Sequence, residues 1–174
     1  MSNERTNPDT LSTGDFDKPF LPTGLNVLTI LTFIGSGIQI LFGVVGFMRA
    51  KTNFDEKDKA MAQMNNEEMP GWAKSIMPNM DNYEEMVTKS FENRLPIFIL
   101  GLVALSLCIY GAMQMRKLKK QGFTFYLIGQ LLPFVTSALF LGLFAFEGII
   151  VGVIIGITLL FILLYALNRK HLVY

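Results

Sequence analysis

The side chains that could do chemistry in this chain are few, and the largest set is a group of methionines. Six methionines lie in residues 61–86, where the pairs Met61/Met64 and Met77/Met80 each share one helical face. Thioether sulfur can bind Cu(I), but no cysteine or histidine joins the set. Methionine at helical spacing is more typical of adaptable apolar packing. We therefore predict no metal site in this segment.

The other reactive side chains are isolated from one another. Cys108 is the only cysteine, so no intramolecular disulfide can form, and its apolar surroundings favour a packing role. His171, the only histidine, lies in a basic tail. The sequence contains no paired catalytic carboxylates, zinc motif, phosphate loop or Ser-His-Asp arrangement. We predict a protein that is not an enzyme, requires no cofactor and binds no nucleic acid.

Four long apolar segments must position these side chains. They comprise residues 25–48, 95–115, 123–144 and 148–167. A helix of about 20 apolar residues crosses a hydrocarbon core of about 30 Å and satisfies its own backbone hydrogen bonds there. No Asp, Glu, Lys, Arg or His lies inside any of the four, so the usual signs of a proton relay or a voltage sensor are missing. The sequence predicts an all-α polytopic membrane protein, a four-transmembrane-helix bundle.

The polar segments complete the predicted organisation. They are a flexible N-terminal tail (1–24), a partly helical amphipathic loop (49–94), a basic loop (116–122) and a C-terminal tail (168–174). The basic loop has four cations in seven residues, and cations in short loops are retained in the cytoplasm. We expect this loop and both tails in the cytoplasm and the long loop outside. Arg49, Lys51 and Arg94 favour the opposite orientation.

The long loop carries a predicted docking surface. The composition of residues 55–64 favours one short helix, and apolar residues three or four apart in 79–91 predict a second. We expect both helices to lie on the outer membrane surface or to cap the bundle. The residues expected to dock there are Trp72, Met77, Met80, Tyr83, Val87 and Phe91.

Two stripes of small residues predict close helix packing, because small side chains let helix backbones approach in lipid. Gly148, Gly152 and Gly156 repeat every four residues along the fourth span. For this face we favour a packing seam within the monomer, and an interface with a second copy or another membrane protein is the alternative. The other stripe lies on one face of the second span and comprises Gly101, Ala104, Cys108 and Gly111.

Two amides lie deep within the spans, Gln39 in the first and Gln130 in the third. We expect each to bond a backbone carbonyl or a Ser/Thr hydroxyl, not the other amide, while a polar cavity is the alternative. Pro133 removes one backbone donor, which predicts a kink between Gly129 and Pro133 in the third span. Gln39, Gly129, Gln130 and Pro133 are therefore the candidate polar pocket or hinge.

Three stretches carry a resemblance to a known group of proteins. They are residues 25–37 (LNVLTILTFIGSG), 115–133 (MRKLKKQGFTFYLIGQLLP) and 165–171 (YALNRKH). In these stretches the chain resembles small uncharacterised four-span membrane proteins of bacteria of the Bacteroidetes group. The resemblance covers most of the membrane part but not the outer loop. It implies a location in a bacterial inner membrane and supplies no activity and no site residue.

Two functional hypotheses fit these observations. The first is a non-catalytic accessory or scaffold subunit of a larger membrane assembly, held through the glycine face of the fourth span and the outer segment. The second is a small oligomeric channel or transporter that uses Gln39, or the region from Gln130 to Pro133, as a polar path. The expected partners are the lipid bilayer and either a membrane protein or a second copy of the chain.

Overall fold

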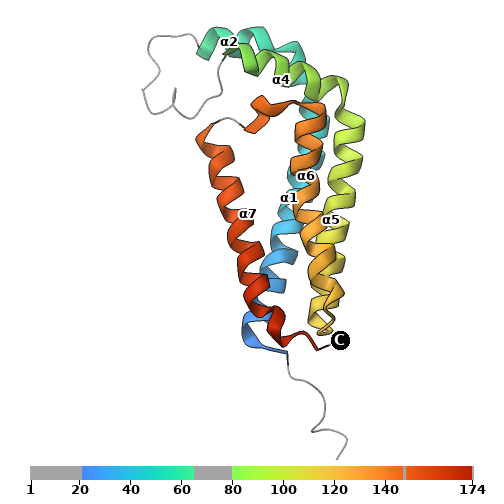
Figure 1. The fold of residues 1–174 in the computed structure, drawn as a ribbon. Coiled ribbons are helices and arrows are strands. Elements are labelled where there is room, and N and C mark those ends of the chain that lie inside the picture. The colour runs from blue at the N-terminus through green and yellow to red at the C-terminus, as the bar shows by residue number, and fades with distance from the viewer. Residues whose placement is uncertain (1–20, 65–79, 147, 174) are drawn as a thin grey trace, which may run out of the picture.

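The computed structural model describes residues 21–64, 80–146 and 148–173, and this part of the chain contains helices and no strand. The α-helices are α1 (Thr23–Asp55), α2 (Lys57–Met64), α4 (Met80–Glu92), α5 (Arg94–Arg116), α6 (Gln121–Phe140) and α7 (Ile149–Asn168). Two short 3-10 helices are η1 (Leu143–Phe146) and η2 (Arg169–His171). The predicted all-α fold class is confirmed (Figure 1).

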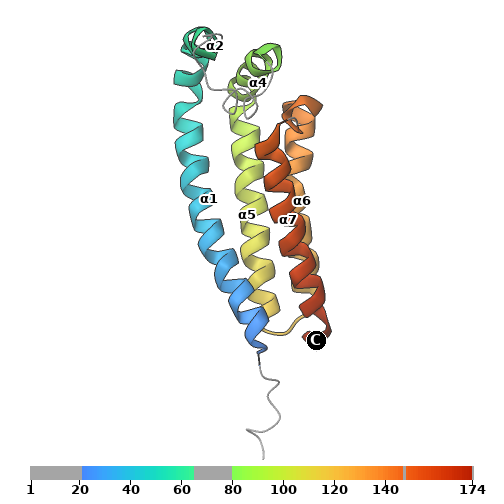
Figure 2. The ribbon, with the colours of Figure 1, turned by 90° about the vertical axis from the view of Figure 1, so that its left-hand side faces the viewer.

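Four of these helices, α1, α5, α6 and α7, are long and apolar enough to cross a membrane. They form the predicted bundle, seen from two sides in Figure 1 and Figure 2. The first span is longer than predicted, because residues 49–55 contain no glycine or proline to end the helix and α1 continues to Asp55. The third ends earlier, at Phe140, shortly before Gly142 adopts a φ of 100°.

The two ends of the bundle differ in charge. The basic end holds the turn between α5 and α6 together with η2, and its cations are Arg116, Lys117, Lys119, Lys120, Arg169 and Lys170. The backbone N–H of Val173 donates to the carbonyl of Leu118 at 3.0 Å, which ties the C-terminal segment to that turn. At the other end, the capped end, α2 and α4 lie across the bundle (Figure 1).

The half of the bundle near the basic end has the closest packing. A Cβ placed on Gly111, Gly122 or Gly129 would lie 2.6–2.7 Å from a backbone atom of the facing helix, so α5 and α6 touch through these glycines. Tyr126 of α6 and Tyr165 of α7 are fully buried beside one another. Glycine contacts and two tyrosines thus fix the helices at this end.

At the capped end, α2 and α4 are the two short helices predicted for the long loop. Lys57 donates from Nζ to Glu84 Oε1 at 2.8 Å, and this hydrogen bond raises the pKa of Lys57 above its ordinary value of 10.5. The rings of Phe54 and Phe91 stack with centroids 4.7 Å apart. α1 is therefore held at both ends, by α4 at the capped end and by the packing of Leu25 and Leu28 near the basic end.

A candidate binding cavity between α1 and α5

The candidate site is a cavity between α1 and α5 in the capped half of the bundle. The buried residues of α1 all lie between Leu25 and Ser36. Beyond them α1 leans away from α5 toward the capped end (Figure 2). The cavity has a volume of about 590 Å³, within the range of about 300–1,000 Å³ typical of small-molecule sites.

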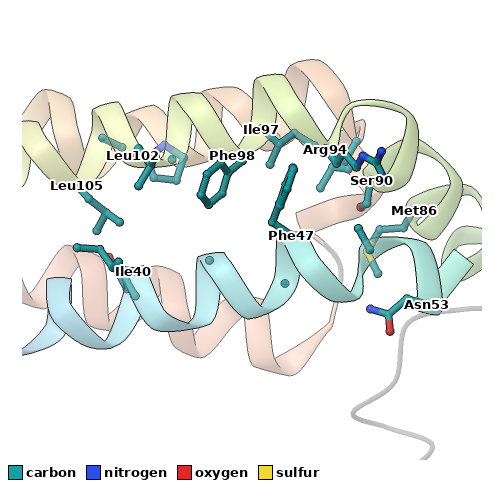
Figure 3. Close-up of a pocket in the computed structure, with 18 of the residues that line it drawn as sticks. Ile40, Phe47, Asn53, Met86, Ser90, Arg94, Ile97, Phe98, Leu102 and Leu105 are labelled. Atoms are coloured by element: carbon teal, nitrogen blue, oxygen red, sulfur yellow. The ribbon is translucent and has the colours of Figure 1, made fainter.

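The walls of the cavity are mostly apolar and come from α1, α4, α5 and α6. Figure 3 shows Ile40 and Phe47 of α1 facing Phe98 and Leu105 of α5 across the space. The polar side chains in its lining are Gln39, Asn53, Tyr83, Ser90, Arg94 and Gln130. Arg94 is the one charged residue among the lining residues that the structure describes. The cavity therefore has mostly apolar walls with a few polar side chains, and a single cation at its capped end.

Arg94 lies among aromatic rings rather than among carboxylates. Its guanidinium carbon is 4.8 Å from the ring centroid of Phe91 and 5.9 Å from that of Phe47, distances that allow cation–π attraction. The ring of Phe47 in turn lies 4.9 Å from that of Phe98, between centroids. The ion pairs within the described ranges each join a lysine to a glutamate, and none of them includes Arg94. In the described part of the chain its charge therefore has aromatic neighbours and no carboxylate partner.

All four residues of the predicted polar pocket or hinge line this cavity: Gln39, Gly129, Gln130 and Pro133. The two amides do not bond each other. Gln130 Nε2 donates to the hydroxyl of Tyr126 at 2.8 Å, so the expectation of a backbone or Ser/Thr partner for Gln130 is wrong. α6 continues through Pro133, and the kink stays a prediction.

A cluster of polar side chains from α1, α6 and α7 borders the cavity on the side of the basic end. Thr32 Oγ1 of α1 lies 2.8 Å from the hydroxyl of Tyr165 of α7, and either oxygen can be the donor. The ring of Tyr165 is 4.4 Å from the ring of Tyr126, which also bonds Gln130. Neither tyrosine was predicted from the sequence to border a site. The spacing of four residues between Tyr126 and Gln130, which places them on one helix face, was the available signal.

The stripe predicted for the second span is divided between two surroundings. Ala104, Cys108 and Gly111 are buried in α5, and their contacts are with Gly122, Tyr126 and Gly129 of α6. These three positions therefore form a packing seam. Gly101 does not belong to it, because a Cβ there would have nothing within 4 Å. It lines the cavity, which Ala104 and Cys108 also border.

The fourth-span glycines do not pack within the monomer. A Cβ on Gly152 or Gly156 would have nothing within 4 Å. Gly148 precedes α7 with a φ of 100° and serves as its N-cap. The expected seam within the monomer is therefore wrong for this face. The reason is geometric, since α7 contacts the other spans near the basic end and stands apart from them toward the capped end (Figure 1).

The predicted docking residues of the long loop are only partly described. Tyr83 and Val87 line the cavity, and Phe91 stacks on Phe54. Trp72 and Met77 lie outside the described residues, as does most of the predicted flexible tail. For Met80 the structure describes the backbone alone. Across residues 21–64, 80–146 and 148–173, no group of three His, Cys, Asp or Glu side chains is placed to hold a metal ion.

Comparison with known proteins gives no match to a family model, to a curated protein or to a solved structure. The functional interpretation therefore depends on three physical features of the chain. These are the open face of α7, the cavity with its single arginine, and the charge difference between the two ends of the bundle.

Proposed function

We propose that this protein is a non-catalytic accessory or scaffold subunit that joins a larger membrane assembly through α7. The observation that carries the proposal is the open glycine face, where a Cβ on Gly152 or Gly156 would have nothing within 4 Å. Apolar surfaces gain little by leaving lipid, but a face of small residues lets another helix approach closely enough for dense packing. A helix of another subunit is the occupant that fits such a face.

The attachment of α7 supports the same proposal. Tyr165 is the one buried residue of α7. The residues of α7 that pack beside it, Phe161, Ile162 and Leu164, also lie toward the basic end. The rest of α7, toward the capped end, is consequently available to a second protein. The β-branched neighbours of its glycines lose little rotamer freedom when they pack.

We place the protein in a bacterial inner membrane with its basic end in the cytoplasm. Two basic clusters that are far apart in the sequence, Arg116–Lys120 and Arg169–His171, meet at this end of the bundle. At the capped end the cations are mixed with carboxylates, as in the ion pair of Lys57 with Glu84. This asymmetry supports the orientation, because positive charge is retained on the cytoplasmic side.

Purification of the tagged protein from its native membrane in a mild detergent, followed by mass spectrometry, tests the proposal. The wild type should retain a reproducible stoichiometric partner, and the double variant Gly152→Leu/Gly156→Leu should lose most of it. Gly37→Leu is the matched control, because a Cβ there also has nothing within 4 Å but the residue lies on α1. Recovery of a homo-oligomer alone, or a partner retained by the double variant, would overturn the proposal.

A small oligomeric channel or transporter is the second candidate, and the amides of Gln39 and Gln130 in the cavity favour it. Tyr126 and Tyr165 are fully buried in the basic half, so a path through the monomer requires their rings to move. Ion or solute flux into proteoliposomes that falls in Gln39→Leu and Gln130→Leu variants would support this candidate. Flux no greater than that of empty liposomes would count against it.

A further inference from the structure

The cavity between α1 and α5 is long, and its capped end lies where the apolar segment of α1 is followed by the polar residues 49–55. Along α1 its lining runs from Asn53 to Gln39, two positions fourteen residues apart and therefore about 21 Å apart in a helix. Arg94 is the first residue of the α5 span and lies at the capped end of the cavity. Within the apolar segment, which ends at Met48, the lining continues to Gln39 over about 14 Å, so the cavity extends through a little under half of a hydrocarbon core of about 30 Å.

Most polar groups of the lining lie toward the capped end, and the amides of Gln39 and Gln130 lie at the other. Figure 3 shows Arg94 and Ser90 near each other there, Asn53 across from them on α1 with Met86 between, and Phe98, Leu102 and Leu105 farther along. No carboxylate is found among the described lining residues. A guanidinium with a hydroxyl nearby suits a phosphate group, because both can donate hydrogen bonds to its oxygens. The apolar walls below suit a hydrocarbon chain.

We propose that the cavity binds an anionic membrane phospholipid, with one acyl chain between α1 and α5 and its phosphate at Arg94. Glycines leave the room for that chain, because a Cβ on Gly43, Gly46 or Gly101 would meet nothing within 4 Å. A partner helix does not fit in its place. The rings of Phe47 and Phe98 are in contact, with centroids 4.9 Å apart, so a helix about 10 Å wide cannot lie between α1 and α5 at this level. The acyl chain would pass beside this ring pair, along Gly46 and Gly101, which also line the cavity.

This site is independent of the proposed docking of α7. No residue of α7 belongs to the cavity lining that the structure describes. Gln39 and Gln130 line the cavity on the side of the basic end of the bundle. They would lie beside the end of the acyl chain. Loss of lipid binding and loss of a protein partner can therefore be measured separately.

Native mass spectrometry of the full-length protein in detergent tests the lipid site directly. Dioleoylphosphatidylglycerol, dioleoylphosphatidylcholine and oleate are added in separate titrations. We expect the wild type to retain one phosphatidylglycerol, with about tenfold preference over phosphatidylcholine. Arg94→Gln should lower phosphatidylglycerol retention about tenfold and remove the preference, because the phosphate loses its charge-assisted hydrogen bonds.

Two further variants distinguish the cavity from the protein surface. Gly101→Leu should lower the retention of phosphatidylglycerol and phosphatidylcholine alike by filling the cavity, while Gly37→Leu should leave both unchanged. Lys117→Gln/Lys119→Gln removes exposed cations from the basic end and should also preserve the bound lipid. Size-exclusion elution and circular dichroism confirm that each variant is folded.

Several results would overturn the proposal. These are equal phosphatidylglycerol retention by the wild type and a folded Arg94→Gln variant, no effect of Gly101→Leu, and loss of the preference in the lysine variant. Binding of oleate without phosphatidylglycerol would also overturn it, because the occupant would then be a free fatty acid and not a membrane phospholipid.

Discussion

Tyr165 attaches α7 to the other spans. Its side chain is fully buried, its hydroxyl lies 2.8 Å from Oγ1 of Thr32, and its ring centroid lies 4.4 Å from that of Tyr126. These contacts join α7 to α1 and to α6. Because α7 has no other buried residue, we expect substitution of Tyr165 to release this helix more than any other single change within it.

Two substitutions separate the contribution of the ring from that of the hydroxyl. Tyr165→Phe removes the hydrogen bond, which in membrane proteins is worth about 0.6 to 1.7 kcal/mol. The freed hydroxyl of Thr32 can turn to a carbonyl of its own helix, so we expect a loss near the lower value, about 0.6 kcal/mol. Tyr165→Ala also removes the ring, and loss of a buried aromatic side chain costs about 3 to 5 kcal/mol.

These free energies of unfolding can be measured on the protein purified in a mild detergent. Sodium dodecyl sulfate is added in steps, and far-UV circular dichroism monitors unfolding. Leu163→Ala on the same helix is the control, because its side chain is 56% exposed and its loss should change stability by under about 0.5 kcal/mol. Equal losses for Tyr165→Phe and Tyr165→Ala would refute the reasoning. So would a loss below about 1 kcal/mol for Tyr165→Ala, because the ring would then contribute little.

Two further predictions concern helix packing and orientation. Gly129→Ala should destabilise the protein by about 1 to 3 kcal/mol in the same assay, because its Cβ would lie 2.7 Å from the backbone carbonyl oxygen of Ala104. Gly101→Ala is the control, and it should leave stability unchanged because a Cβ at Gly101 has nothing within 4 Å. In a Cys108→Ser background, Asp58→Cys should react with a membrane-impermeant maleimide in intact spheroplasts and Lys119→Cys only after permeabilisation. The reverse pattern would show that the basic end faces outward.

The four spans were predictable because uninterrupted apolar length is a local property of the sequence. The extent of a helix beyond the apolar segment was harder to predict. α1 continues through the polar residues 49–55 to Asp55, where its Phe54 ring packs on Phe91 of α4. That contact depends on a segment nearly forty positions away, and no pattern within α1 indicates it.

The packing partners were only partly predictable. The small-residue stripe around Cys108 and Gly111 was recognised, but its counterpart of Gly122 and Gly129 was not, because glycines seven residues apart do not form a short repeat. The stripe also included Gly101, which faces the cavity. Helical spacing places residues on a common face, but the separation of the helices decides which of them make contact. That separation is a tertiary property.

The cavity and the free face of α7 differ in how the surrounding helices are held, and this difference bears on both proposals. α1 is attached at both ends, through Thr32 in the basic half and through Phe54 at the capped end. The cavity beside α1 is thus bordered by contacts at each end and can bind a lipid without a large rearrangement. α7 is attached near its basic end alone, where Tyr165 is buried. A partner can therefore shift α7 at little cost to the core, which suits a helix that joins an assembly.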